Sequence, residues 1–270
     1  MKNNFLKFLL LFFIMSTNSL GIEEFNFDVT EIEILKNGNK YIGKKGGIAK
    51  TKDGTEIHAE NFDYNKVKNI LIATGNVKID DKKNQIKIFS NKITYFKDKE
   101  IITTDGDSKA LDKSSIIFAN KFSYNRISDI INASKNVKIN NKIEKYIIYS
   151  EDITYFRNEE KIFSKGKTRS LFDDKYNFLS TDVLILRNLK KLSSSNPSTI
   201  TDDNSNKYNL SNFVYLYKKK ILKGENLQIQ TNYQKKKSDK LFFTNAIIDF
   251  KDSSFVSKET KISLHKELFD

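Results

Sequence analysis

One stretch of the chain occurs twice, and this internal repeat limits the possible folds more than any other feature. Residues 57–106 align without a gap on residues 117–166, and 21 of the 50 aligned pairs are identical. Within this repeat, tyrosines recur at Tyr64, Tyr95, Tyr124 and Tyr155, which indicates a finer unit of about 30 residues. A unit of that length without helical periodicity is one to two β-hairpins long. The repeat therefore predicts a stack of β units.

The pattern inside each copy supports strands. Apolar β-branched residues alternate with polar ones on both sides of Thr74-Gly75-Asn76 and again around Thr94. Such alternation is typical of strands with one buried face. Signals for helix starts and stops are missing, so the sequence predicts an all-β fold.

The ends of the chain and its loops suggest five segments. Residues 1–21 have a basic start (Lys2, Lys7) and a short apolar run, which predicts a signal peptide; a membrane anchor is the alternative. Residues 22–54 are expected to form an N-terminal edge segment, and residues 55–192 the repeat domain with two 60-residue copies. Residues 193–206 are rich in Ser and Asn and predict a polar loop. Residues 207–270 predict a degenerate third copy, since terminal repeats are often atypical.

The composition argues against an enzyme. Cysteine is absent, which excludes disulfides, thiol nucleophiles and thiolate metal ligands. His58 is replaced by Phe118 in the second copy, which indicates a strand position rather than a catalytic one, and His265 is the only other histidine. The adjacent carboxylates Asp80-Asp81 and Asp202-Asp203 lie in predicted turns and are weak candidates for a metal site. We therefore expect no catalysis, no cofactor and no metal.

The formal net charge of +13 has two interpretations. A basic exported protein could favour anionic partners such as lipid phosphates. The abundance of Lys, Asn and Ile together could instead reflect the base composition of the genome. A nucleic-acid partner is disfavoured because the lysines are spread along the whole chain.

The recurring motifs resemble the OstA-like domain of lipopolysaccharide export. They comprise an Ala-Glu pair four residues before Tyr64, the run Ala73-Thr74-Gly75-Asn76-Val77-Lys78-Ile79, then Ile93-Thr94-Tyr95, then Gly106. The second copy keeps Asn136-Val137 but has Lys135 in place of the glycine. The domain occurs in the periplasmic bridge protein LptA and in the N-terminal periplasmic region of LptD, and the length and third copy favour the LptD type without its barrel. We expect the chain to be a fragment of a longer reading frame, with a stand-alone relative as the alternative.

The resemblance implies a β-jellyroll of two sheets folded in a V, open at both ends, with a groove along its length that binds lipopolysaccharide by its acyl chains. The expected groove residues are the inward ones of both copies: Ile70, Ile72, Val77, Ile79, Ile88, Ile93, Tyr95, Ile130, Val137, Ile139, Ile153 and Tyr155. Lys78, Lys87 and Lys138 are the expected contacts of the head group.

The expected partners and place follow from the same resemblance. They are lipopolysaccharide, other jellyroll proteins of the transport system that dock by edge strands, and an outer-membrane lipoprotein and barrel, in the periplasm or at the periplasmic face of the outer membrane. The alternative is a structural or adhesin-like exported β-repeat protein with a closed, dry core and no lipid ligand.

Overall fold

The computed structural model describes residues 25–235 and 237–265, and most of them lie in antiparallel strands. The predicted signal peptide, residues 1–21, lies outside the described residues. The strands are β1 (Phe25–Leu35), β2 (Lys40–Thr51), β3 (Glu56–Ala59), β4 (Asn61–Asn65), β5 (Ile70–Asp81), β6 (Ile86–Phe96), β7 (Ile101–Asp105), β8 (Ser108–Leu111), β9 (Ser115–Ala119), β10 (Lys121–Asn125), β11 (Ile130–Asn141), β12 (Tyr146–Phe156), β13 (Lys161–Phe172), β14 (Tyr176–Leu186), β15 (Lys191–Ser194), β16 (Ser198–Thr201), β17 (Lys207–Leu210), β18 (Asn212–Leu216), β19 (Ile221–Gln230), β20 (Lys240–Asp249) and β21 (Ser254–Ser263). Two 3₁₀ turns, η1 (Lys97–Lys99) and η2 (Arg157–Glu159), are the helical elements of these ranges, and no helix among them is long and apolar enough to cross a membrane.

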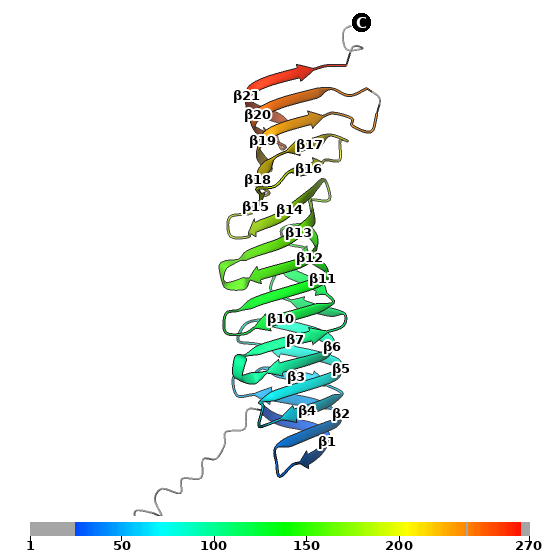
Figure 1. Cartoon of the computed structure of the whole chain (residues 1–270), viewed down its shortest axis with the longest axis vertical. Helices are drawn as coiled ribbons and strands as arrows, with labels where there is room; N and C mark the ends of the chain where they lie inside the picture. The colour runs from blue at the N-terminus through cyan, green and yellow to red at the C-terminus, as the bar shows by residue number, and fades with distance from the viewer. Residues whose placement is uncertain (1–24, 236, 266–270) are drawn as a thin grey trace, which may run out of the picture.

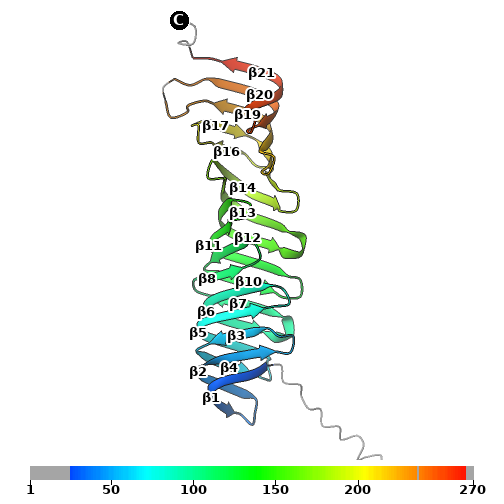
Figure 2. The same ribbon diagram turned by 180° about the vertical axis from the view of Figure 1, so that it is seen from behind.

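The strands stack into an elongated rod with β1 at one end and β21 at the other (Figures 1 and 2). Long strands bend in the middle and belong to two sheets, whereas pairs of short strands supply one strand to each sheet. The first half of β5 pairs with β4, and its second half pairs with β3. The first half of β11 likewise pairs with β10 and its second half with β9. We call the sheet that holds β4 and β10 sheet 1, and the sheet that holds β3 and β9 sheet 2. This confirms the all-β, two-sheet expectation.

In β5 and β11, the corresponding long strands of the two copies, the bend coincides with a β-bulge. In β5 the register with β6 shifts between Thr74 and Val77, and Gly75 and Asn76 both have positive φ, at 81° and 47°. Gly75 also packs against Glu60 so closely that a Cβ atom would overlap it. The second copy bends at Lys135 and Asn136, again with positive φ. The repeated motif around Asn76 is therefore the corner of the fold, since an extra residue with positive φ turns a strand sharply.

The two sheets enclose a single apolar core along the rod. Tyr95, Tyr124, Tyr146, Tyr215 and Phe172 are among its largest side chains, each less than 2% exposed. The recurring tyrosines of the sequence thus pack between the sheets.

The segment 193–206 was wrongly expected to be a loop. It contains the end of β15 and all of β16, joined by short turns. Ser194 and Ser198 are buried, and the Ser198 hydroxyl lies 2.7 Å from that of Ser180 in the neighbouring strand β14. Ile200 is fully buried between them and the next turn. The serines are compatible with a strand because each buried hydroxyl has a hydrogen-bond partner.

Candidate lipid-binding interior

Most of the predicted groove residues do face the space between the sheets. Nine of the twelve are at most 3% exposed and belong to the common core: Val77, Ile79, Ile88, Ile93, Tyr95, Val137, Ile139, Ile153 and Tyr155. Whether any of them contacts a lipid stays a prediction.

The inward direction of Ile70, Ile72 and Ile130 was predicted wrongly. These three are half-buried and lie on the outer side, while their neighbours Leu71 and Ile131 are at most 1% exposed. The reason is the bulge. In β5 the two residues Gly75 and Asn76 lie opposite a single residue of β6. Odd-numbered residues of β5 therefore point inward along the whole strand. In β6 the inward residues are even-numbered before the bulge and odd-numbered after it.

The interior is not open along its length, contrary to the expected groove. The turns at the ends of sheet 1 reach those of sheet 2 and close the mouth of the V, along a line that we call the seam. Its central residue is Arg126, whose side chain is 3% exposed. Its Nη2 lies 2.7 Å from Asp53 Oδ2, and its Nε lies 2.8 Å from Asp81 Oδ2. It also contacts Glu100 and donates to the Tyr95 hydroxyl at 2.6 Å.

The interactions within this cluster stabilise the charged forms of Arg126 and Asp53. Burial by itself lowers the pKa of the Arg126 guanidinium, but its hydrogen bonds to Asp81 and Asp53 outweigh burial and raise the pKa. Burial acts to raise the pKa of Asp53, yet hydrogen bonds from Thr51 and Arg126 hold it well below the usual range. Burial also raises the pKa of Tyr95, and the nearby Glu100 adds to that shift. The cluster is therefore a buried ion-pair network rather than a proton-transfer site.

The same cross-link recurs at successive turns. Arg157 Nη2 donates to the backbone oxygen of Asn84 at 2.8 Å, and Arg187 pairs with Asp112 at 3.4 Å. Further along, two lysines continue the seam with the pairs Lys190–Glu144 at 2.6 Å and Lys220–Asp173 at 3.4 Å. Three of the four arginines of the chain thus lie at the seam. The sequence carries a signal that was missed: a basic residue stands two positions after each repeated tyrosine, at Lys66, Lys97, Arg126 and Arg157.

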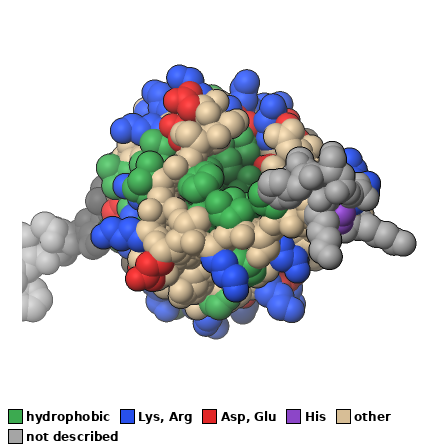
Figure 3. Space-filling view, turned by 90° about the horizontal axis from the view of Figure 1, so that it is seen from above, with side chains coloured by type: hydrophobic (Ala, Val, Ile, Leu, Met, Phe, Trp, Pro, Cys, Tyr) green, Lys and Arg blue, Asp and Glu red, His purple; other side chains and the backbone are tan. Residues whose placement is uncertain are grey.

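The seam changes character toward β21. Among the ion pairs of the described ranges, none joins the turn after β20 to a turn of sheet 2. Instead the ring of Phe250 stacks on Tyr176, with centroids 4.6 Å apart. Beside it is a cavity of about 270 Å³ with a mixed lining, in which apolar residues such as Leu241 and Ile248 stand beside polar ones such as Asp202 and Thr231. Figure 3, a view onto the β21 end, shows hydrophobic side chains in the hollow between the two walls. We call this opening the β21 mouth.

The opposite end is filled. Phe25 packs edge-on against Tyr64 and Tyr95, at centroid distances of 5.0 and 5.6 Å, and Phe27 stacks on Tyr41. The rod therefore has an accessible apolar interior at the β21 mouth and a packed aromatic interior at the β1 end.

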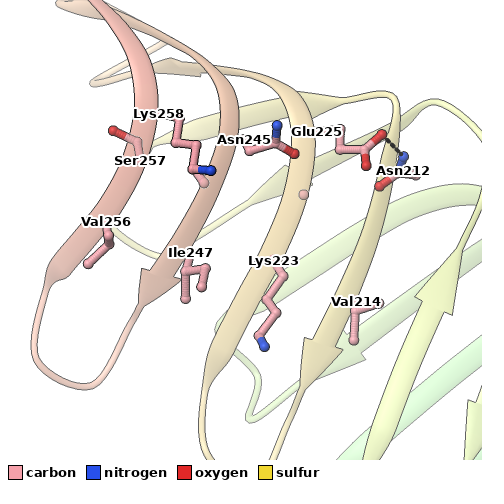
Figure 4. A pocket seen from close by; sticks show the side chains of 11 residues that line it. Asn212, Val214, Lys223, Glu225, Asn245, Ile247, Val256, Ser257 and Lys258 are labelled. Carbon is pink, nitrogen blue, oxygen red and sulfur yellow. Dashed lines mark hydrogen bonds between the residues drawn. The ribbon is translucent and has the colours of Figure 1, made fainter.

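Both terminal strands have a free edge. β1 pairs only with β2, and β21 only with β20, within the described ranges. Ile32 and Ile34 on β1 are 45% and 58% exposed, and Val256 on β21 is 73% exposed. On the outer face near β21, Val214, Lys223, Ile247 and Val256 form one row across four strands and line a hollow of about 440 Å³ (Figure 4). Unpaired strand edges of this kind are ready sites for another strand.

The three predicted head-group lysines lie on the outer face of sheet 2. Lys78 and Lys138 follow the buried residues Val77 and Val137, so they point away from the interior. Lys87 pairs with Asp80 at 3.3 Å on the same face. The three lysines thus lie on the side of sheet 2 that faces away from the interior, and their contact with a head group stays a prediction.

The described residues contain no group of three or more His, Cys, Asp or Glu side chains arranged to hold a metal ion. The two predicted carboxylate pairs have other partners. Asp81 binds Arg126, and Asp202 accepts the hydroxyl of Tyr208 at 2.8 Å.

Comparison with known proteins finds a likeness among solved structures. No family model and no curated protein matches the chain. Among solved structures, the chain is similar to LptH, the LptA-homologous periplasmic component of the lipopolysaccharide transport device of Pseudomonas aeruginosa. The identity is 14% and the TM-score 0.38, over 41% of this chain and 82% of that one.

Proposed function

We propose that the protein is a non-enzymatic carrier of lipopolysaccharide at the periplasmic side of the outer membrane, which holds acyl chains between its two sheets. The observation that carries this proposal is the apolar interior that becomes accessible at the β21 mouth. Each methylene buried there would contribute about 0.8 kcal/mol. The repeated motif that resembles the OstA-like domain supports the same function.

The free edges support assembly with other transport proteins of the same kind. β1 carries Asp28, Glu31 and Glu33, whereas β21 carries Lys258 and Lys261 beside a single glutamate. Opposite charge on the two edges favours head-to-tail stacking by strand addition. The proposal also includes an outer-membrane lipoprotein and barrel as further partners. In its narrowest form, it assigns the protein to the LptD type.

The test is photocrosslinking to lipopolysaccharide. A photoreactive amino acid is placed at the mouth positions Leu241 and Ile248, and at their outward neighbours Phe242 and Ile247 as matched controls. We expect adducts at the first two positions and not at the second two. Equal labelling of all four, or labelling of none in folded protein, would refute lipid binding between the sheets.

A second candidate function has its own support. The packed tyrosines and the Arg126 and Arg187 cross-links are what a closed structural β-repeat requires. This candidate predicts that the protein forms fibres or rods by edge pairing and takes up no lipid at any interior position, including the β21 mouth.

A further inference from the structure

A regular row of cations and rings crosses the outer face of sheet 2. The row follows the strand register from β5 to β14, one residue from each of eight strands. Its members, which we call the outer ladder, are Lys78, Phe89, Lys109, Phe118, Lys138, Tyr149, Arg169 and Leu179. A basic side chain therefore alternates with an aromatic ring over seven consecutive strands.

The members of the outer ladder contact one another. Lys109 Nζ lies 4.7 Å from the centroid of the Phe89 ring. The Tyr149 ring lies between two cations, with Lys138 at 5.6 Å and Arg169 at 5.7 Å. Phe118 and Tyr149 remain 40% and 37% exposed, so both side chains are accessible to a ligand.

The charges of the outer ladder are not neutralised by the protein. Within the described ranges, none of Lys78, Lys109, Lys138 and Arg169 is in an ion pair; Arg169 Nε donates to the neutral amide of Asn177 at 2.8 Å. The neighbouring row differs, since Lys87 is paired with Asp80 there. Four cations with no internal partner form a linear field that attracts a polyanion.

The spacing of the cations and the residues on either side of the outer ladder indicate which class of ligand can bind there. Adjacent strands are about 4.8 Å apart, so the cations recur every ~10 Å over a length of ~29 Å. Two shallow clefts of about 660 and 750 Å³ lie along the row and share Asn136. Asn120 and Thr168 supply further polar groups there, and Asp107 and Glu151 are the acidic residues of their walls.

We propose that the outer ladder binds a linear acidic polysaccharide. A pyranose ring is about as long as the spacing between strands, so sugar rings can stack on Phe118 and Tyr149 while an acidic group on every second sugar meets a cation. Amide and hydroxyl groups of the clefts would bind the sugar hydroxyls. A nucleic acid fits less well, because its phosphates recur every 3.4 Å along a duplex strand, much closer than the cations. The ladder faces away from the interior, so this site goes beyond the proposed function and does not depend on it.

The experiment measures binding of a defined chondroitin decasaccharide, an alternating uronate polymer, by calorimetry or fluorescence anisotropy. The variant K109Q/K138Q/R169Q removes three ladder cations. The control K92Q/K165Q/K223Q removes three exposed lysines of sheet 1 that form no ion pair within the described ranges. We expect Kd to rise about tenfold or more in the first variant. The control should change it by less than about threefold, since charges beyond a Debye length are screened.

A second variant tests the rings. Y149S keeps every charge, so we expect a rise in Kd of about two- to fivefold with an unchanged dependence on salt. Neutral dextran, a single-stranded DNA of equal charge and anionic vesicles complete the set of probes. Equal loss in both triple variants, tighter ladder-dependent binding of DNA or vesicles than of chondroitin, or no effect of Y149S would each overturn the proposal.

Discussion

Replacement of Arg126 by methionine should be the most destabilising single change at the seam. The variant keeps most of the side-chain volume but leaves Asp81 without its cation, and the Asp81 side chain is 0% exposed. Loss of one partner from a buried ion pair costs about 3–5 kcal/mol, because the remaining charge is desolvated and unpaired. Urea unfolding followed by far-UV circular dichroism should show that loss as a lower midpoint at an unchanged m-value.

Two further variants isolate the cause. The double variant R126M/D81N no longer has the unpaired Asp81 charge. Its loss of unfolding free energy should therefore be less than the sum of the losses in the two single variants. K87Q breaks the exposed Lys87–Asp80 pair and should cost less than about 1 kcal/mol. If R126M unfolds at the same urea concentration as K87Q, the seam does not stabilise the closed rod and the reasoning is wrong.

The pH dependence gives an independent readout of the same cluster. The folded-state pKa of Asp53 is lowered, so its contribution to stability is present above the unfolded pKa of about 4. That contribution is lost as the pH falls from there through the lower folded pKa. R126M removes one of the hydrogen bonds that lower this pKa, so the variant should lose less stability than the wild type over that acidic range. If R126M and the wild type lose the same amount of stability over this acidic range, Arg126 is not a cause of the lowered pKa of Asp53.

Three other perturbations test separate parts of the fold. Gly75→Ala should cost more stability than Gly166→Ala, because both glycines have positive φ but only at Gly75 would a Cβ overlap a neighbour; equal urea midpoints would contradict this. Tyr215→Phe should stabilise the protein by about 1 kcal/mol in thermal unfolding, since its buried hydroxyl has no hydrogen-bond partner among the described residues; a destabilisation would show that the hydroxyl is satisfied. Val256→Glu should weaken head-to-tail self-association in analytical ultracentrifugation, because it places a negative charge on the β21 edge that would meet acidic β1, whereas Val67→Glu, at an equally exposed turn position, should not.

Local features of the fold were predictable from the sequence, and long-range ones were not. The alternation around Val77 and Ile79 gives the strand and its buried face because the period of two is a property of neighbouring residues. Alternation alone could not show whether the side chains of Ile70 and Ile72 point into the interior or away from it. It depends on which of two paired strands carries the extra residue, and only the register between β5 and β6 fixes that.

The seam illustrates the same limit at the candidate site. Arg126 and Asp53 are 73 residues apart, and their contact requires the turns of two sheets to meet. The basic residue after each repeated tyrosine was visible, and the acidic partners Asp53, Asp81, Asp112, Glu144 and Asp173 also recur every 28 to 32 residues. Which acidic turn meets which basic turn, however, is decided by the way the two sheets pack. The sequence therefore indicated an apolar interior and could not show that ion pairs close it.

The position of the seam separates two ways in which such a rod could carry lipid. Between Arg126 and Lys220, entry from the side would break the ion pairs of the seam, which are buried at Arg126 and partly exposed at Lys220, and displace packed rings such as Phe172. At the β21 mouth the cavity already exists, and its nearest closure is the contact between Phe250 and Tyr176. A carrier with a terminal site should therefore label at Leu241 but not at Ile139, and R126M should leave that pattern unchanged. A carrier with a continuous channel should label at both, with stronger labelling at Ile139 in R126M, because opening the seam then becomes easier.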